Sequence, residues 1–266
     1  MMKRIIFCII AGTAFVSSTA AACTMTNFTW TIANSSVNNV ASANKSVAQA
    51  TFDVNTVRIS APSTSNNVEP KGWVAQPTLN VKSYAQLSNI ITGLPHGKYT
   101  TIEYDPEFWS ATPKVEQQNP CLYAQKFGTL AHQYGYVAEE DPATDLGNAV
   151  SHKGETNIQW FINSDIAGCV ATYVDIFDRQ AQTEETNTAT YQADVQQTAS
   201  QAKAANSQVI DLSNLTPNVQ GRNVSASQLT NDANAVRPYV QGFFLNVGGT
   251  YTDKHTTVSF LQNIGY

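Results

Sequence analysis

The pattern of apolar and polar residues is most regular after residue 99, where short apolar runs alternate with amphipathic segments. β-Favouring residues fill the segment 99–104, and Pro106 and Pro113 end that strand, because proline cannot donate a hydrogen bond to a neighbouring strand. A helix is predicted to begin at Asn119-Pro120, since asparagine is a good helix cap and proline suits the first helical turn. This order of a strand and then a helix is the start of a β/α unit.

The same alternation continues to the C-terminus. Strands that alternate with helices of 10 to 15 residues form parallel βαβ units. Seven or eight such pairs in 266 residues predict an α/β protein with a (β/α)8 TIM-type barrel, incomplete or irregular at its N-terminal side. A doubly wound open sheet is the alternative. The later strands are expected at 136–138, 170–177, 209–212 and 242–247, and the helices at 122–135, 157–166, 190–205, 225–239 and 254–264.

The pattern before residue 95 is weaker. Phe28, Trp30 and Ile32 alternate with other residues and favour a short strand, but the segment 23–50 has few large apolar residues and is predicted to be an N-terminal arm or linker. The barrel domain is therefore assigned to residues 51–266. Within it, early strands are expected at 52–59 and 72–75, and a helix is expected from a Ser83 cap to Gly93.

The first residues have the features of a secretory signal peptide, predicted to span 1–22. Lys3 and Arg4 precede the apolar run 5–16, and Ala20-Ala21-Ala22 forms a cleavage site in front of Cys23. Cys23 is a candidate for a bacterial lipid anchor, although the leucine usually found three residues earlier is replaced by Ala20. A free terminal cysteine is the alternative. We expect a secreted or periplasmic protein, or one anchored by lipid at the cell surface.

The composition supports export and excludes some partners. Charged residues make up 13% of the chain, about half of the usual fraction of about 25%, so Asn, Gln, Ser and Thr must supply much of the polar surface. A net charge of −5 gives no reason to expect nucleic acid as a partner. Beyond the signal peptide, the sequence contains no apolar segment long enough for a transmembrane helix.

Two of the four cysteines are predicted to form a disulfide. Cys8 leaves with the signal peptide and Cys23 is accounted for above, which leaves Cys121 and Cys169. Their bond would link two neighbouring β/α units, one cysteine at a helix start and the other just before a strand. Neither the cysteines nor the four scattered histidines have metal-ligand spacing, so no metal is expected. The absence of GxGxxG and GxxxxGK[ST] motifs leaves no support for a nucleotide cofactor.

Three segments of the later chain carry a family resemblance: YDPEFWSATPKVEQQNP, VDIFDRQAQTEE and VQGFFLNVGG. They resemble a group of poorly characterised secreted bacterial proteins that are described as glycoside-hydrolase-like barrels. The resemblance implies a barrel fold and a carbohydrate partner, and it carries no established catalytic residue. The matching positions are Tyr104, Asp105, Glu107, Trp109, Thr112, Pro113, Glu116, Gln117, Asn119, Pro120, Gln180 and Gln182.

Carboxylates after the strand at 99–104 suggest glycoside hydrolysis, which uses one carboxyl group as a proton donor and another as nucleophile or base. Asp105 and Glu107 lie two residues apart, so in extended chain they point the same way, toward the mouth of the barrel. Glu107 is the predicted proton donor, and Asp105 is predicted to raise its pKa or to position it. The alternative is that Asp105 only accepts backbone hydrogen bonds in a turn. Candidates for a second carboxylate are Glu140, Asp141, Asp175, Asp178 and Asp211.

Other side chains near strand ends are candidates for sugar binding. Aromatic rings offer an apolar face to the CH face of a sugar, and amides hydrogen-bond hydroxyl groups. The alternative to sugar binding is a structural role, in which the aromatic residues only pack the loop and the glutamines form internal hydrogen bonds. Glu103 is expected to face away from Tyr104 as a buried partner of a lysine or arginine. The predicted substrate-binding residues are Tyr104, Trp109, Glu140, Asp178, Gln180, Gln182 and Phe244, with Phe108 as a further ring.

The leading hypothesis is a secreted glycoside hydrolase that acts on an extracellular or cell-wall polysaccharide by carboxylate acid/base chemistry. The alternative is a barrel without catalysis, either a carbohydrate-binding protein or a cell-surface interaction protein held by lipid at Cys23. No serine lies in a G-x-S-x-G turn, so an esterase triad has no sequence support.

Overall fold

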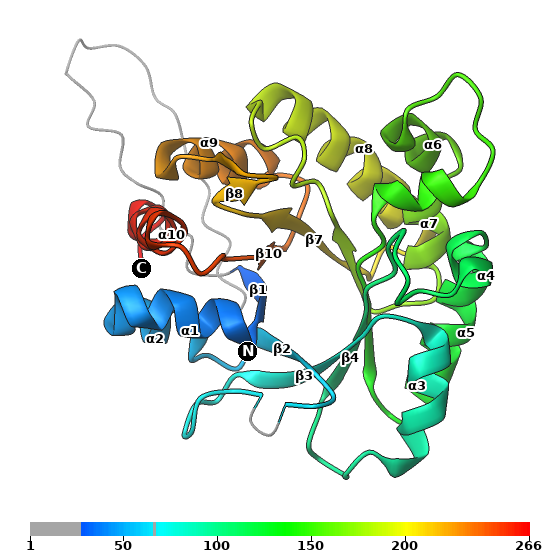
Figure 1. Ribbon diagram of the computed structural model, residues 1–266, viewed down its shortest axis with the longest axis horizontal. Coiled ribbons are helices and arrows are strands. Elements are labelled where there is room, and N and C mark those ends of the chain that lie inside the picture. Colours follow the sequence, from blue (N-terminus) through cyan, green and yellow to red (C-terminus); the bar gives the residue numbers. More distant parts are fainter. Residues whose placement is uncertain (1–27, 66–67) are drawn as a thin grey trace, which may run out of the picture.

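A closed ring of eight parallel strands forms the centre of the computed structural model, which describes residues 28–65 and 68–266 (Figure 1). The strands follow one another around the ring in the order β1-β10-β7-β6-β5-β4-β3-β2, so the first and last strands pair and close the barrel. The predicted (β/α)8 barrel is confirmed. Its strands are β1 (Thr29–Ala33), β2 (Val57–Pro62), β3 (Gln76–Val81), β4 (Thr101–Tyr104), β5 (Val137–Glu140), β6 (Ile176–Arg179), β7 (Ile210–Leu215) and β10 (Gly242–Leu245).

Helices surround this ring and cover its outer face (Figure 1). A small antiparallel hairpin, β8 (Asn218–Val219) with β9 (Arg222–Asn223), lies apart from the barrel sheet. Two short 3-10 turns lie at Ile91–Gly93 and Thr144–Ala149. The helices are α1 (Asn34–Ala43), α2 (Lys45–Phe52), α3 (Tyr84–Ile90), α4 (Lys114–Gln117), α5 (Pro120–Gln133), α6 (Asn157–Asn163), α7 (Ile166–Ala171), α8 (Thr188–Ala205), α9 (Ala226–Val236) and α10 (Tyr251–Asn263).

The prediction of an arm or linker over 23–50 is wrong for the described residues 28–50. They form β1, α1 and most of α2, and β1 is a full member of the ring between β10 and β2. The buried residues of α1 are small, namely Ser36, Val37 and Val40. Asn44 caps α2 by accepting a hydrogen bond from the Val47 N–H. The barrel therefore begins at β1. The predicted signal peptide and Cys23 lie outside the described residues.

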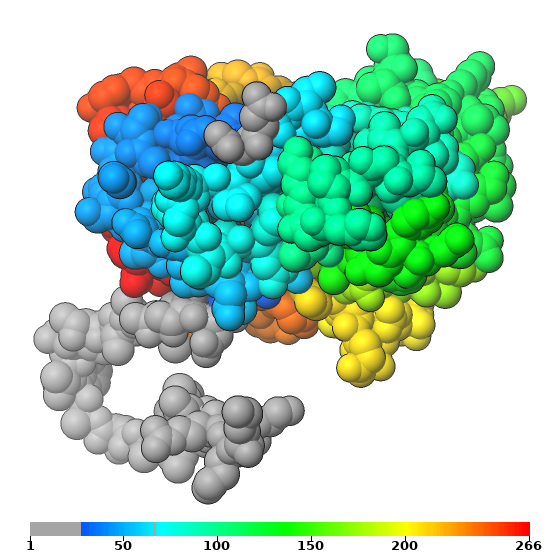
Figure 2. All heavy atoms as spheres, turned by 90° about the horizontal axis from the view of Figure 1, so that it is seen from below, coloured from blue at the N-terminus to red at the C-terminus, as the bar shows by residue number. Residues whose placement is uncertain are grey.

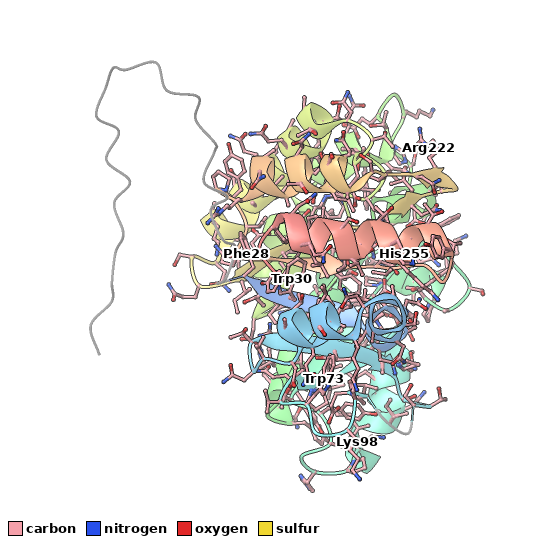
Figure 3. All side chains as sticks on the ribbon, turned by 90° about the vertical axis from the view of Figure 1, so that its left-hand side faces the viewer. Phe28, Trp30, Trp73, Lys98, Arg222 and His255 are labelled. Atoms are coloured by element: carbon pink, nitrogen blue, oxygen red, sulfur yellow. A yellow bond between two sulfur atoms is a disulfide. The ribbon has the colours of Figure 1, made fainter. Side chains whose placement is uncertain are left out.

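Trp30 packs where the first and last strands of the barrel, β1 and β10, meet. Its ring lies 5.6 Å from the Phe243 ring of β10, and it meets Phe52 of α2 and Phe260 of α10 edge to face. Figure 3 shows Trp30 at the level between the blue N-terminal helices and the red α10. The same neighbourhood appears in Figure 2, where the blue segment lies against the red C-terminal segment. A large buried aromatic ring of this kind stabilises the closure by removing much apolar surface from water.

Three predicted strands differ from the observed ones. The strand expected at 52–59 is β2, which begins at Val57 because Phe52 still belongs to α2. The prediction of a strand at 72–75 is wrong, because these residues form a turn and irregular chain, and β3 begins only at Gln76. The strand expected at 170–177 begins only at Ile176, after α7. A short apolar run suits a buried helix as well as a strand, and periodicity cannot separate the two. The irregularity of the barrel lies between β2 and β3, where the described residues contain no helix.

The two faces of the strands differ in polarity. Trp30 and Ile32 of β1 face the helices, whereas Thr31 points into the barrel and donates a hydrogen bond of 2.7 Å to Glu139 of β5, on the opposite side of the ring. The apolar core therefore lies between the sheet and the helices. The barrel interior is polar, in contrast to the branched apolar residues that usually fill such barrels.

The predicted disulfide between Cys121 and Cys169 is confirmed, with 5.5 Å between the two Cα atoms. Cys121 lies in the first turn of α5, and Cys169 lies in α7 rather than just before a strand. The bond thus joins two neighbouring outer helices. None of the described helices combines the length and the apolar character needed to cross a membrane.

Replacing both cysteines, Cys121→Ser with Cys169→Ser, is expected to lower the free energy of unfolding by roughly 3–4 kcal/mol, because the unfolded chain regains the freedom of a 48-residue loop. Urea unfolding of both proteins measures the difference. Adding a reductant should shift the midpoint of the wild-type protein and leave that of the double variant unchanged. Equal midpoints for the two oxidised proteins would contradict the expectation.

Candidate active site at the mouth of the barrel

A cavity of about 260 Å³ opens at the carboxyl ends of the barrel strands. All eight strands contribute a residue of their own or the residue that follows them, from Ala33 at the end of β1 to Phe244 of β10. This end of a (β/α)8 barrel is where active sites of the fold are built. The floor and one wall are acidic, with Glu103, Asp105, Glu107 and Asp141 lining them.

Asp105 is the most connected side chain of the cavity. Lys82, which follows β3, forms an ion pair with its Oδ2, and Gln180 Nε2 donates a hydrogen bond of 3.1 Å to its Oδ1. Glu107 also hydrogen-bonds the Asp105 carboxylate. Asp105 is almost fully buried, so these partners compensate a charge that water solvates only in part. The group Lys82–Asp105–Glu107 therefore forms one hydrogen-bonded unit.

Glu107 is half-buried at the rim of this unit. Burial, together with the negative charges of Asp105 and Asp145, raises its pKa to about 7, while Lys82 opposes the shift. The pKa of Lys82 is raised as well: burial lowers it, but the neighbouring Asp105 carboxylate outweighs that effect. At neutral pH the Glu107 carboxyl group is therefore part protonated and part ionised, which suits a group that gives and takes a proton.

The loop that carries Glu107 is fixed by Thr112. The Thr112 hydroxyl donates a hydrogen bond of 2.7 Å to the Lys82 carbonyl, and it accepts bonds from the Glu107 N–H and the Trp109 indole N–H. The Phe108 N–H donates to Asp145 at 3.0 Å. These bonds connect the loop to the ends of β3 and β5, so the sequence after β4 forms a defined wall of the cavity.

Further carboxyl groups point into the barrel interior, and one of them, Glu103, also forms part of the cavity lining. Burial raises the pKa of Glu103 to about 8, and raises those of Glu139 and Asp178 as well. Each has a polar partner: Glu103 accepts a hydrogen bond from Asn80, Asp178 from Asn214, and Glu139 from Thr31. Glu103 is buried as expected, but its direct partner is an amide rather than a lysine or arginine. Among the described residues no group of three His, Cys, Asp or Glu side chains is arranged to hold a metal ion.

The structure brings several predicted site residues together. Asp105, Glu107, Gln180, Gln182 and Phe244 all line the cavity. Gln180 Nε2 also donates to the Asp141 carbonyl at 2.8 Å, and Gln182 Nε2 donates to Gln180 Oε1 at 3.3 Å, so the two glutamines form a connected wall. Asp141, one of the candidates for a second carboxylate, lines the same cavity. Their roles toward a ligand stay predictions.

Tyr104 and Glu140 were predicted to bind substrate, and this prediction is wrong. Both lie on the outer face of the sheet and are fully buried under the helices. The Tyr104 ring packs 5.1 Å from that of Phe127 in α5, and its hydroxyl donates to Glu116 at 2.9 Å. Burial keeps the pKa of Glu140 well above its usual value. Side chains alternate along a strand, so a neighbour of Asp105 or Asp141 necessarily faces the other side.

Asp178 also does not reach the cavity. It is fully buried in the barrel interior, where Asn214 Nδ2 lies 3.3 Å from its Oδ2, so its prediction as a substrate-binding residue is wrong. Asp175 precedes β6 and pairs with His132 at the opposite end of the barrel, at 2.8 Å. Asp211 lies near the start of β7. Of the five candidates for a second carboxylate, only Asp141 lines the cavity.

Trp109 lies beside the cavity rather than in it. It is half-buried, and Lys82 Nζ lies 4.9 Å from the centre of its ring. With the exposed Phe108, it lines a separate depression of about 460 Å³ on the neighbouring surface. The indole therefore separates the acidic cavity from this depression.

Lys82 and the asparagines of the cavity were missed by sequence reasoning. Asn80 and Lys82 alternate at the end of β3, and Asn214 has the same place on β7. Polar residues two apart at the end of an apolar strand are the signal that could have found them. It was overlooked because the strand was expected at 72–75.

Fold and site together define a parallel (β/α)8 barrel with an acidic cavity at the carboxyl ends of its strands. No family model matches the chain, and no curated protein matches it. Among solved structures, a thiamine phosphate pyrophosphorylase from Pyrococcus furiosus is similar at 12% identity and a TM-score of 0.21, over 70% of this chain and 95% of that chain. The order of the strands in this chain by itself shows a closed barrel.

Proposed function

We propose that this protein is an exported glycoside hydrolase that acts on an extracellular or cell-wall polysaccharide, with Glu107 as its proton donor. The observation that carries the proposal is the hydrogen-bonded unit of Lys82, Asp105 and Glu107 at the catalytic end of the barrel. A carboxylic acid with a pKa near neutrality is what protonation of a glycosidic oxygen needs.

The chemistry follows from the two carboxyl groups. Glu107 gives its proton to the glycosidic oxygen as the bond between that oxygen and the anomeric carbon breaks. Water then adds its oxygen to the anomeric carbon, and the proton that it loses returns to the Asp105–Glu107 pair. The Asp105 carboxylate keeps its ion pair with Lys82 throughout the reaction. Asp105 positions Glu107 through their hydrogen bond, and its negative charge disfavours the ionised form of the Glu107 side chain. Gln180 fixes the orientation of Asp105.

Export is supported by two features. The N-terminal segment has the organisation of a signal peptide, and the Cys121–Cys169 disulfide is typical of proteins from oxidising compartments. A lipid anchor at Cys23 is a further proposal, because Cys23 follows the expected cleavage site. Mass spectrometry of the mature N-terminus distinguishes a diacylglyceryl cysteine from an unmodified one.

Release of reducing ends from a panel of bacterial and plant polysaccharides tests the enzyme directly. The second candidate is a carbohydrate-binding barrel without catalysis. It is favoured by the ion pair that engages Asp105, since an acid held by a lysine is less free to react. A protein that retains one of the polysaccharides on an affinity gel, but releases no reducing ends from any of them, is the second candidate.

The pH dependence of kcat/KM provides a further prediction. The proton donor must be protonated, and burial with the charge of Asp105 raises the pKa of Glu107 to about 7. Activity should therefore be retained below pH 7 and fall as the pH rises through about 7, with a slope of one proton on the alkaline side. Initial rates between pH 4 and 9 at low substrate concentration measure this limb. An alkaline limb near the ordinary pKa of glutamate would show that Glu107 is not the donor.

A further inference from the structure

Asp141 is almost fully buried, and one of its two carboxylate oxygens has no hydrogen-bond partner among the described residues. Its exposed fraction is 4%, it lines the acidic cavity, and its Oδ1 has no partner among the described residues. The backbone around it is fully engaged, because its N–H donates to the Tyr104 carbonyl and its carbonyl accepts from Gln180. A buried acceptor without a donor costs free energy, so this carboxyl group is placed for a donor that the ligand supplies.

The charge of the cavity indicates which kind of donor this is. Four carboxyl groups line it, from Glu103, Asp105, Glu107 and Asp141, and the one cation among its described lining residues is Lys82. Lys82 is already paired with Asp105. Because Asp105 already holds Lys82, a ligand phosphate or carboxylate finds no free cation among the described lining residues. A ligand ammonium, in contrast, can replace the proton on one of the other carboxyl groups.

We propose that the cavity binds a sugar unit with a free amine, and that its ammonium group donates to the Asp141 carboxylate. The inference rests on the proposed function and narrows its substrate to a polysaccharide with de-N-acetylated amino sugars. An N-acetylated unit has no ammonium charge, and it would place an acyl group against the Asp141 carboxylate, so it should bind more weakly. The ring hydroxyls of the unit face Gln182 and Asn80, which are neutral donors and acceptors.

Binding of such a unit is coupled to proton release. Burial and neighbouring acids raise the pKa of Asp141, and an ammonium ion beside it favours the ionised form. Affinity for the amino sugar should therefore rise with pH for as long as its amine stays protonated, whereas affinity for a neutral sugar should not. The groups that face Asp141 and share this titration are Glu103, Asp105 and Glu107 from β4 and its loop, Asp178 from β6, and Lys82 after β3.

Calorimetry on the full chain with Glu107→Gln, which binds without turnover, tests the proposal. The probes are the glucosamine and galactosamine trimers, their N-acetylated counterparts and the glucose trimer, titrated at pH 6 and pH 7.5. At least one amine-bearing trimer should bind more tightly than its N-acetylated counterpart and release protons, seen as a dependence of the heat on buffer ionisation. Tighter binding of an N-acetylated or neutral trimer would overturn the inference, and so would the absence of binding by both amine-bearing trimers.

Asp141→Asn, made in the same background, should lower the affinity for the amine-bearing trimer roughly ten- to a hundred-fold and abolish proton release, since it removes a charge-assisted hydrogen bond at constant shape. Asp165→Asn is the matched control, because it removes one charge from the exposed outer layer. Equal losses in the two variants would overturn the role of Asp141. Hydrolysis of an uncharged polysaccharide by the wild-type protein would leave the glycosidase intact and refute only the amine preference.

Discussion

Glu107→Gln is expected to reduce kcat on the cleaved polysaccharide by a factor of roughly 10²–10⁴, the range for loss of a general acid. Glutamine has the shape of glutamic acid and can still contact Asp105, but it has no proton to give to the leaving oxygen. The loss should appear in kcat, because the interaction is made with an oxygen that gains charge only as the bond breaks. Initial rates of reducing-end release over a range of polysaccharide concentrations give the two constants.

The control is Glu155→Gln, which makes the same chemical change where the carboxylate accepts a hydrogen bond from Asn163 on the outer helical layer, at 2.7 Å. Its kcat should equal that of the wild-type protein. Substrates with a good leaving group should rescue the Glu107 variant, because a leaving group of low pKa needs no proton. Unchanged turnover in the Glu107 variant, or no rescue by such a substrate, would contradict the assignment.

The barrel was predictable because apolar residues recur with one period in strands and with another in helices. The sequence after residue 99 shows both periods clearly. The disulfide was predictable from the number of cysteines once export was assumed. The helix α1 was missed because its buried residues are small. The alternation of Phe28, Trp30 and Ile32 favoured the strand β1, but its place in the ring was missed because it depends on pairing with β10, far away in sequence. Contacts of that range leave no local pattern.

The candidate site was predictable where chemistry lies at a visible strand end, as with Asp105 and Glu107. The site was not predictable where a shift of one residue along a strand decides whether a side chain points into the barrel or toward the outer helices. Tyr104 and Asp105 are neighbours, yet Tyr104 packs against α5 and Asp105 lines the cavity. Lys82 is the clearest example of a site residue that was missed. It forms an ion pair with Asp105 across the neighbouring strands β3 and β4, and the sequence alone did not show that these strand ends lie side by side.

Arg179 forms a buried ion pair on the outer face of β6, next to Gln180, which lines the cavity. Its guanidinium group is almost fully buried on the outer face of β6, with Nη2 2.6 Å from Asp194 Oδ2 of α8. Its Nη1 donates to the Gln180 carbonyl at 2.5 Å, and the guanidinium carbon lies 4.8 Å from the Phe161 ring centre. Arg179 therefore connects α8 to the residue whose side chain orients Asp105.

Arg179→Met is expected to lower the free energy of unfolding by roughly 3–5 kcal/mol, because it leaves the Asp194 carboxylate buried without its partner. Chemical unfolding followed by circular dichroism measures the change. Arg222→Met is the matched control on an exposed strand, and its effect should stay within about 0.5 kcal/mol. Figure 3 shows Arg222 at the periphery of the molecule.

The double variant Arg179→Met with Asp194→Leu separates the two contributions of the pair. Removal of both charges leaves no buried ion unpaired, so most of the lost stability should return. The hydrogen bond to the Gln180 carbonyl stays lost in the double variant, and kcat should remain lowered if that bond positions Gln180 against Asp105. Recovery of stability without recovery of kcat would assign Arg179 a positioning role through Gln180. Recovery of both would leave it a structural residue only, and a double variant as unstable as Arg179→Met would refute the ion-pair account.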